Sequence, residues 1–358
     1  MAGDLRDLIR AKAAESVRIT TTSKGLSGFV GKINTFYKKE VITSGALSVE
    51  RFSSGSIELD IVLGGGWPRR RIALLYGKES SGKTFTALQA CKTLNDLGES
   101  CLIVDPEGTY DPKWAEEVIG LQRDKNLYVQ PEYGEQVVDI VTSGIREGIF
   151  GLIVVDSLAA TVPSVELEKS SEEQQMGVQA RLLNKAFRKW QSAMIAMQGK
   201  APTLILINQE REKIGVMYGD PTTLPGGKSQ HFYSSIKVKF KAGKVHDEPG
   251  KTEGAYVELA GVVTKNKTFR PHLEFSLLMF LKEMDGHKLG EIDNFDTLIK
   301  YCRELGLLSV VKGICTLKVD GEEKVFPSKD AVISELRRQP ELRKKVTNFV
   351  ITKRVALL

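Results

Sequence analysis

One short stretch of the sequence carries the residue types that bind phosphate. The stretch is GKESSGKT, Gly77 to Thr84, and it fits the pattern G-x-x-x-x-G-K-[ST] at every defined position. Its glycines let the backbone fold tightly, so that backbone N–H groups and the start of the following helix face an anion. Lys83 would supply positive charge to the β- and γ-phosphates, and the Thr84 hydroxyl can ligate Mg²⁺. The sequence therefore predicts a site for ATP and Mg²⁺, contacted by Gly77, Glu79, Ser80, Ser81, Gly82, Lys83, Thr84 and Phe85.

Three apolar runs elsewhere in the chain end in polar side chains that suit the same chemistry. Asp156 closes the run GLIVVD, where a carboxylate would face the Mg²⁺ shell. Glu107 follows the run that ends at Asp105, and it could orient a water against the γ-phosphate. Asn208 and Gln209 end the run TLILINQ as an amide pair able to hydrogen-bond that phosphate. Each acid alone would be read as a solvated strand end, but beside a complete phosphate loop the catalytic interpretation is favoured.

The elements that must position these side chains are strands alternating with helices. The runs RIALLYG, CLIVD, GLIVVD and TLILINQ are apolar on both faces and are separated by helical patterns. This alternation is typical of a mainly parallel sheet that is covered on both sides. We therefore expect an α/β fold with its ligand site at the carboxyl ends of the strands.

The two ends of the chain differ from this core. Asp4 to Ser16 predicts an amphipathic helix that is too short to be stable alone and must dock on something. Thr20 to Gly45 is rich in Gly, Ser, Thr and Lys and indicates a linker. From about Asp293 the patterns FDTLIKYCRELGLL and AVISELRRQPELRKKVTNFV predict helices around a strand pair. The expected domains are residues 1–45, a core at 46–290, and a small C-terminal α/β domain at 291–358.

The composition limits the classes of protein that are compatible with the chain. Its 358 residues are 41% hydrophobic and 27% charged, which is ordinary for a soluble globular protein. Neither a signal pattern nor a membrane-spanning apolar run is found, and the four cysteines lack metal-ligand spacing. We expect a cytoplasmic protein without a membrane partner. The net charge of +6 permits a polyanionic partner without requiring one.

A long polar segment follows Gln209 and continues to Tyr233. It is rich in glycine and is interrupted by Pro221 and Pro225. A connection of this length without its own secondary structure is usually either functional or disordered. Because it starts at the predicted ligand edge, the sequence favours a binding loop controlled by the nucleotide. A disordered surface loop is the alternative.

Seven segments resemble, in the same order, the bacterial-type RecA strand-exchange recombinases. They are SGSIELDIVLGGGWPRRRIALLYGKESSGKT, VDPEGTYDP, IVVDSLAATVP, MGVQARLLNKAFRKW, INQEREKIGVMYGDP, PGGKSQHFY and VTKNK. The resemblance covers about Val49 to Lys267, and the C-terminal pattern is consistent with it to near Val350. It implies a RecA-type P-loop ATPase core that forms helical filaments on single-stranded DNA and exchanges strands with homologous duplex DNA. The N-terminus matches poorly, and TKRVALL stands where the family has an acidic tail, so we expect DNA loading to be less inhibited.

The resemblance also implies roles for residues around the nucleotide. Glu107 is similar to the water-activating carboxylate, and Gln209 to the sensor that links the γ-phosphate to the long loop. Asp111 matches an adenine-contacting position, and Trp114 stands in place of the usual tyrosine.

Further matching positions imply an active site shared between subunits. Lys265 and Lys267 are similar to a pair that reaches ATP bound on the neighbouring subunit. Phe232 matches an aromatic side chain at that interface, and His231 replaces the usual lysine beside it. The N-terminal helix would dock on the neighbour, and repeated head-to-tail contacts of this kind build a helical filament.

The DNA-binding positions of the family fall on two loops. The first loop and its following helix match Met176, Gly177, Arg181 and Arg188, and the second loop matches Arg211, Ile214, Gly215, Gly226 and Gly227. Glycine amides and arginines can hold phosphates without reading base edges. A secondary duplex site is matched by Lys241 but not by Val262. Nearby Lys237, Lys239 and Lys244 would either substitute or form only a solvated strand face, and both interpretations stay open.

Other functions remain as alternatives to the recombinase. A recombination mediator or regulatory RecA-like paralogue would bind ATP and partners without strand exchange. Such paralogues often lose Glu107, Gln209 or the loop glycines, all of which are present here. A ring-forming helicase would be expected to carry an arginine finger rather than TKNK. A small-molecule kinase would not need two loops that resemble DNA-binding loops.

Overall fold

The computed structural model describes residues 26–37, 49–167, 177–212, 222–247, 254–284, 286–319 and 321–358. The chain divides into two units, Met1–Ser48 and Val49–Leu358. In the first unit, helix α2 (Leu26–Tyr37) contradicts the linker predicted over these residues. The apolar residues of LSGFVGKINTFY recur at intervals of three and four, and this periodicity outweighs the glycine and serine content. The predicted docking helix at Asp4 to Ser16 lies outside the described residues.

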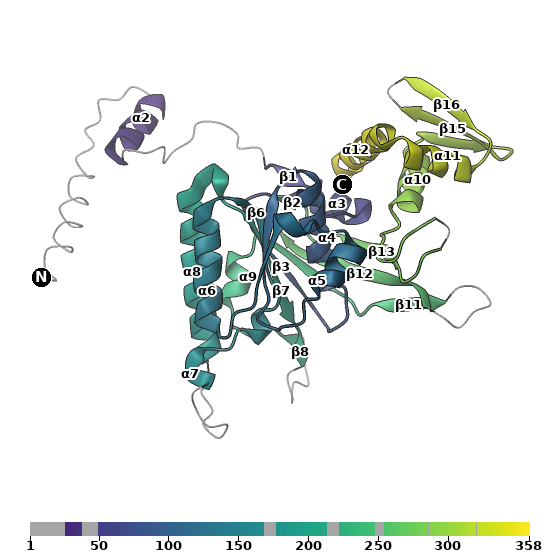
Figure 1. Cartoon of the computed structure of the whole chain (residues 1–358). Coiled ribbons are helices and arrows are strands. Elements are labelled where there is room, and N and C mark those ends of the chain that lie inside the picture. Colours follow the sequence, from purple (N-terminus) through teal and green to yellow (C-terminus); the bar gives the residue numbers. More distant parts are fainter. Residues whose placement is uncertain are drawn as a thin grey trace, which may run out of the picture. The chain divides into compact units, whose positions relative to one another are not determined.

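A nine-stranded, mainly parallel sheet forms the centre of the second unit (Figure 1). Its six parallel strands, in sheet order, are β5 (Asn126–Val129), β4 (Ser100–Val104), β6 (Phe150–Val155), β7 (Thr203–Gln209), β3 (Ile72–Gly77) and β10 (Ile236–Phe240). Three antiparallel strands extend the sheet beyond β10, and these are β12 (Gly254–Asn266), β11 (Lys244–Asp247) and β13 (Glu274–Phe280). The predicted α/β fold is confirmed, whereas the extension from β10 to β13 was not expected.

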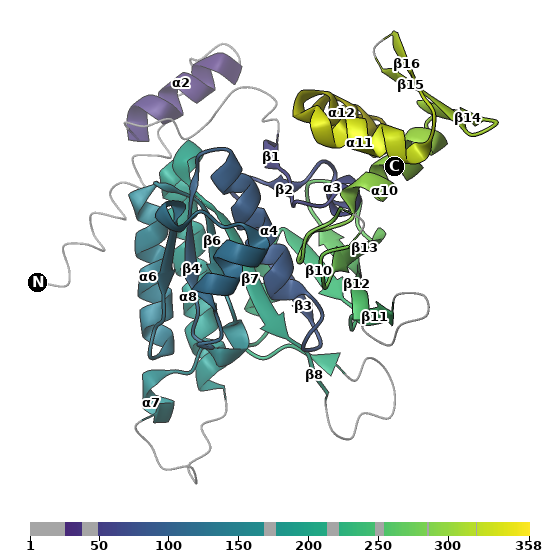
Figure 2. The same cartoon turned by 45° about the vertical axis from the view of Figure 1, so that its right-hand side comes forward.

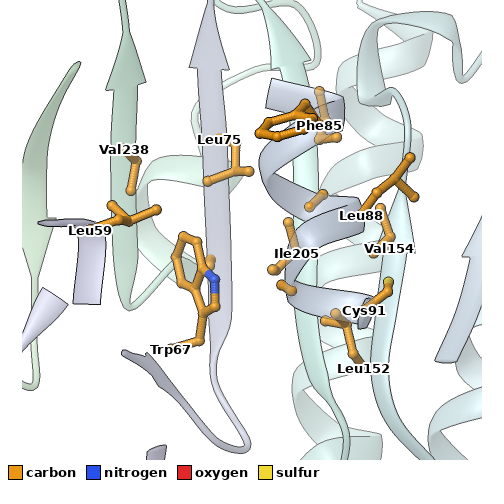
Figure 3. Close-up of a cluster of buried hydrophobic side chains, with 14 of the residues drawn as sticks. Leu59, Trp67, Leu75, Phe85, Leu88, Cys91, Leu152, Val154, Ile205 and Val238 are labelled. Atoms are coloured by element: carbon orange, nitrogen blue, oxygen red, sulfur yellow. The ribbon is translucent and has the colours of Figure 1, made fainter. Parts of the chain in front are cut away.

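Helices cover both faces of this sheet (Figures 1 and 2). Helix α4 (Lys83–Asp96) packs on one face, and α6 (Gly134–Glu147) and α8 (Val178–Met197) pack on the other. Successive residues of a strand point to opposite faces, so β3, β4, β6 and β7 each contribute to both hydrophobic clusters. On the α4 side, Phe85, Leu88 and Cys91 face Leu75, Val154 and Ile205 (Figure 3).

Shorter elements connect the main ones. Around the start of the unit lie β1 (Arg51–Phe52), α3 (Ile57–Leu63) and β2 (Trp67–Pro68). Between the main strands lie α5 (Pro112–Trp114), the π-helical turn η1 (Ala115–Ile119), η2 (Arg123–Lys125), η3 (Leu158–Ala160), α7 (Ser164–Leu167), η4 (Gln198–Lys200), β8 (Arg211–Glu212), β9 (Thr222–Thr223) and α9 (Ser229–Tyr233). Within the described ranges, every helix is too short or too polar to span a bilayer.

The C-terminal part of the chain has its own small sheet. Its elements are α10 (Asn294–Glu304), the antiparallel strands β14 (Leu308–Val311), β15 (Ile314–Val319) and β16 (Glu322–Phe326), and the helices α11 (Lys329–Arg338) and α12 (Pro340–Leu357). The segment AVISELRRQPELRKKVTNFV therefore forms two helices, α11 and α12, and not one. Pro340 begins α12 because proline suits the first turn of a helix and not its interior. This part packs on α3 through Ile57 and Ile61. The predicted boundaries at residues 45 and 290 stay predictions.

Candidate nucleotide site and DNA-binding loops

The phosphate loop leaves β3 and leads into the first turn of α4. Gly77 ends the strand, and Gly82 precedes the helix in a left-handed conformation with φ of 85°. A Cβ atom at Gly82 would lie 2.7 Å from Leu259 Cδ1 on β12, so a larger residue is excluded twice, by conformation and by packing. The loop therefore brings its backbone close against the sheet, with the start of α4 behind it.

Lys83 and Ser81 contact each other within the phosphate loop. The Lys83 ammonium is buried and donates to the Lys78 carbonyl at 2.5 Å and to Ser81 Oγ at 3.2 Å. Burial lowers the pKa of Lys83, and the Asp156 and Glu107 carboxylates act in the opposite direction. A buried ammonium in contact with neutral oxygens is well suited to an anionic ligand.

A hydroxyl and a carboxylate meet next to the loop. Thr84 Oγ1 donates to Asp156 Oδ2 at 2.5 Å, which joins the start of α4 to the end of β6. Burial raises the pKa of Asp156 to about 6, while the Thr84 hydrogen bond acts to lower it. Hydroxyl and carboxylate oxygens are the ligands that Mg²⁺ prefers, and a cation would favour the ionised carboxylate.

Asp105 organises the loop that carries Glu107. Its buried carboxylate accepts hydrogen bonds from the backbone N–H groups of Glu107 at 3.0 Å, Gly108 at 2.8 Å and Tyr110 at 2.9 Å. The Tyr128 hydroxyl donates to the same carboxylate at 3.2 Å. The sequence prediction placed Asp105 only at a strand end. An Asp followed by Pro-Glu-Gly is nevertheless a turn signal that could have identified it.

Glu107 and Gln209 meet although 102 residues separate them in the sequence. Gln209 Nε2 donates to Glu107 Oε1 at 3.0 Å. Of the expected amide pair, Asn208 is fully buried and donates to the Pro225 carbonyl at 3.0 Å and to Gln230 Oε1 at 2.7 Å. Only Gln209 is therefore available at the ligand edge of the sheet. A contact of Gln209 with the γ-phosphate stays a prediction.

The residues after the second loop are tied back to β7 through Gln230. Gln230 Nε2 donates to the Pro225 carbonyl at 2.8 Å and to the Gly227 carbonyl at 2.9 Å. Gly226 packs so closely on α8 that a Cβ atom there would lie 2.2 Å from Leu183 Cδ1. The end of the second loop thus contacts both the strand of Gln209 and the helix that follows the first loop.

The predicted DNA-binding residues are only partly described. Gly177 precedes α8, and Arg181 and Arg188 are exposed on that helix at positions seven residues apart, so they lie on one helical face. Arg211 is exposed in β8, which pairs with β9 at the base of the second loop. Met176, Ile214 and Gly215 lie outside the described residues.

A second group of predicted site residues lies around α9. Phe232 is 71% exposed, which is unusual for an aromatic side chain in a folded domain. The Lys265 ammonium donates to the His231 carbonyl at 2.6 Å, and Lys237 Nζ lies 2.8 Å from His231 Nδ1. Burial lowers the pKa of His231, and the positive charges of Lys237 and Lys265 lower it further. The neutral ring therefore accepts the hydrogen bond from Lys237.

This α9 group is separate from the phosphate loop in the described part of the chain. There, neither Lys265 nor Lys267 makes a hydrogen bond or ion pair with a residue of the loop. Lys265 is half-buried and Lys267 is exposed at the end of β12. The structure therefore brings Lys83, Thr84, Asp156, Glu107 and Gln209 together, and separately His231, Phe232 and Lys265.

The predicted adenine-contacting residues begin a short helix. Asp111 caps α5, and its Oδ1 accepts from the backbone N–H groups of Lys113 at 2.9 Å and Trp114 at 3.1 Å. Trp114 is 38% exposed. A contact of either side chain with adenine stays a prediction.

The lysines considered for a secondary duplex site have local partners. Lys239 pairs with Glu210 at 2.9 Å, Lys241 lies 3.7 Å from Glu274, and Lys237 contacts His231. These contacts favour the solvated and locally paired strand face. Capture of duplex DNA there stays a prediction.

Comparison with known proteins shows which family the chain resembles. Residues 25–283 match the RecA N-terminal domain family. The chain is 39% identical to Protein RecA of Mycoplasma mycoides subsp. mycoides over 285 residues, which is 78% of this chain and 80% of that protein. It is 32% identical to Protein RecA of Deinococcus radiodurans over 335 residues, 92% of this chain and 88% of that protein.

A plant relative extends the same comparison. The DNA repair protein recA homolog 1, chloroplastic, of Arabidopsis thaliana is 33% identical over 343 residues, 93% of this chain and 74% of that protein. The resemblance first drawn from seven short segments is therefore confirmed over most of the chain. With its phosphate loop, its paired Glu107 and Gln209 and its RecA-type sheet, this chain belongs to the RecA family of DNA recombination and repair proteins.

Proposed function

We propose that this protein is a DNA-dependent ATPase that forms helical filaments on single-stranded DNA and catalyses homologous pairing and strand exchange. One observation carries the proposal. The side chain at the nucleotide edge, Gln209, is next to Asn208, whose hydrogen bonds to Pro225 and Gln230 lead directly to the end of the second DNA loop. A change at the nucleotide can therefore be transmitted to a DNA-binding segment through two adjacent residues.

The residues present fit ATP and Mg²⁺. Lys83 and the backbone N–H groups of the phosphate loop would hold the β- and γ-phosphates, and Thr84 and Asp156 would hold Mg²⁺. A bound Mg²⁺ would neutralise part of the negative charge on the phosphates. Asp111 and Trp114 would contact the base.

Glu107 would act as the general base that accepts a proton from the attacking water. Its loop is fixed by the hydrogen bonds to Asp105, so the carboxylate has a defined position although it is exposed. Gln209 donates to the same carboxylate and would exchange that contact for one to the γ-phosphate. This exchange would report the state of the nucleotide to the second loop.

Lys265 and Lys267 would complete the active site of the neighbouring subunit. Two features support this assignment: both lysines lie apart from the phosphate loop of their own subunit, and Phe232 beside them exposes an apolar ring suited to a subunit contact. Each subunit then contributes one half of two different sites. Hydrolysis in this arrangement requires an assembled filament.

DNA binding would depend on the phosphate backbone. Arg181 and Arg188 on α8 and Arg211 at the base of the second loop are exposed and can contact phosphates. Contacts of this kind leave the bases free to test pairing with a second strand. Binding should therefore weaken as salt concentration rises.

The proposed activity is tested by strand exchange between circular single-stranded DNA and linear duplex DNA in the presence of ATP. Joint molecules should form with a homologous duplex and not with a heterologous duplex of the same length. If the protein binds DNA and hydrolyses ATP but forms no joint molecules, the regulatory paralogue becomes the better assignment.

Replacing His231 with lysine is expected to raise DNA-dependent turnover by about twofold to tenfold, or roughly 0.4 to 1.4 kcal/mol of transition-state stabilisation. The lowered pKa keeps the His231 ring neutral at pH 7, whereas lysine adds a fixed charge beside the shared site. The measurement is kcat at saturating ATP and single-stranded DNA. Without nucleotide, the variant should unfold at a lower temperature, because its new ammonium joins Lys237 and Lys265.

The pH dependence of this gain follows from the direction of the His231 shift. Because burial lowers its pKa below the ordinary 6.5, the wild-type ring gains charge only as the pH falls below that value. The ratio of His231→Lys turnover to wild-type turnover should therefore stay level from pH 8 to pH 7 and shrink as the pH falls from 6.5 towards 5. His231→Gln, which stays neutral, is the control. A ratio that stays constant from pH 6.5 to pH 5 would count against the idea.

A further inference from the structure

The side chain of Arg51 joins two segments that lie far apart in the sequence. Its Nη1 donates to the carbonyl of Leu63, the last residue of α3, at 3.0 Å and to the carbonyl of Gly66, in the turn that follows, at 3.0 Å. Its Nη2 donates to the Thr268 carbonyl at 2.9 Å and to Thr268 Oγ1 at 3.0 Å. One guanidinium thus ties the turn after α3 to the backbone just beyond the end of β12.

Asn266 closes these contacts into a ring. Its Nδ2 donates to the Leu63 carbonyl at 3.2 Å, the same oxygen that Arg51 contacts. Its Oδ1 accepts from the backbone N–H of Thr268 at 2.9 Å and from Thr268 Oγ1 at 2.9 Å. Asn266 stands between Lys265 and Lys267 in the sequence, so the ring fixes the backbone from which both lysines extend.

Arginine suits this position for a geometric reason. All four of its hydrogen bonds go to uncharged oxygens, and burial lowers the pKa of Arg51. Its role here is therefore not to neutralise a carboxylate. The planar guanidinium presents donors along two edges and can bridge two segments, whereas the single ammonium of lysine cannot span both.

We propose that Arg51 is the positioning residue for the Lys265 and Lys267 pair. This inference rests on the proposed function, in which the pair reaches ATP held by the neighbouring subunit. Arg51 itself contacts neither the phosphate loop nor Glu107 in the described residues. Its effect on hydrolysis is accordingly exerted on the site of the neighbour and not on the site of its own subunit.

The first test is the substitution Arg51→Met, which keeps an apolar stem and removes the donors. The rate of ATP hydrolysis on long single-stranded DNA should fall roughly tenfold to hundredfold, as expected when reacting groups are misplaced by about 1 Å. Affinity for single-stranded DNA should stay close to that of the wild type. Wild-type turnover in this variant would overturn the inference.

Arg69→Met is the matched control. Arg69 makes two hydrogen bonds to Glu99, at 2.8 and 2.6 Å, and lies over the Phe52 ring. This variant also loses a hydrogen-bonded, partly buried guanidinium but leaves the ring around Asn266 intact. Its turnover should equal that of the wild type, and a loss as large as that of Arg51→Met would mean that both act through stability alone.

Mixed filaments locate the defect. In an equimolar mixture of Arg51→Met and Glu107→Gln, about one quarter of the subunit contacts pair an intact Glu107 on one subunit with a correctly positioned lysine pair on its neighbour. The mixture should therefore recover about one quarter of the wild-type rate, well above either variant alone. A mixture of Arg51→Met with Lys265→Ala should recover nothing, because both variants are defective in the same half of the site.

The outcomes separate this inference from the function on which it rests. Suppose that Lys265→Ala with Glu107→Gln recovers activity while Arg51→Met with Glu107→Gln does not. Arg51 then acts within its own subunit and the inference is wrong. If neither mixture recovers activity, the two-subunit site itself is wrong. Should Arg51→Met fail to fold, Arg51→Lys, which retains the charge but cannot bridge, takes its place in the same mixtures.

Discussion

An equimolar mixture of two inactive variants, Glu107→Gln and Lys265→Ala, is expected to hydrolyse ATP on long single-stranded DNA at about one quarter of the wild-type rate. The Lys265→Ala subunit keeps its phosphate loop and Glu107, and the Glu107→Gln subunit keeps Lys265. Where the first presents its loop to the second, a complete active site forms. The measurement is steady-state hydrolysis of the mixture and of each variant alone at equal total protein.

This expectation follows from the separation of the two groups of residues. In the described chain, the Lys265 ammonium donates to the carbonyls of His231 and Phe232 and not to the phosphate loop. If both halves acted within one subunit, mixing would give only the sum of two inactive proteins. Lys265→Ala mixed with Lys267→Ala is the control, and it should stay inactive because both changes affect the same half. Activity in that control would contradict the two-subunit account.

The single substitution Glu107→Gln is expected to lower DNA-stimulated hydrolysis by about 10² to 10⁴-fold, the usual contribution of a general base. Glutamine retains an oxygen that can accept from Gln209 Nε2, so the 3.0 Å contact can be kept while the proton acceptor is lost. Binding of ATP and assembly on DNA should therefore survive. The measurement is kcat, together with filament formation in the presence of ATP.

The matched control for this variant is Glu132→Gln. Glu132 is an exposed acid beyond β5, and its side chain has no contact with the phosphate loop among the described residues. Its removal should leave turnover unchanged. If Glu107→Gln retained more than a tenth of the wild-type rate, another group would have to be the base.

The sequence predicted the centre of the sheet better than its edge. The strands β4, β6 and β7 are apolar on both faces because helices cover both, and such runs are recognisable without a structure. In β10 and β12, buried residues alternate with partly exposed ones, as in IKVKF. Alternation predicts a strand but does not say which neighbour it pairs with, and so the extension of the sheet went unrecognised.

In the candidate site, residues of a continuous motif were predicted, whereas contacts between residues far apart in the sequence were not. Lys83 and Thr84 were predicted because the motif around them is continuous in the sequence. The role of Asp105 was missed although its backbone partners lie within five residues and the turn signal is local. The role of Asn208 was missed because its partner Gln230 lies 22 residues away. Contacts of this kind are set only when the chain has closed around them.

Hydrolysis of ATP by the wild-type protein, with and without single-stranded DNA, tests the central claim most directly. If active sites form between subunits on DNA, the rate should be low without DNA and should rise strongly with long single strands. Oligonucleotides too short to hold two neighbouring subunits should give little stimulation. A rate that is the same with and without DNA would contradict the account, because it would separate Gln209 from the loop it is proposed to control.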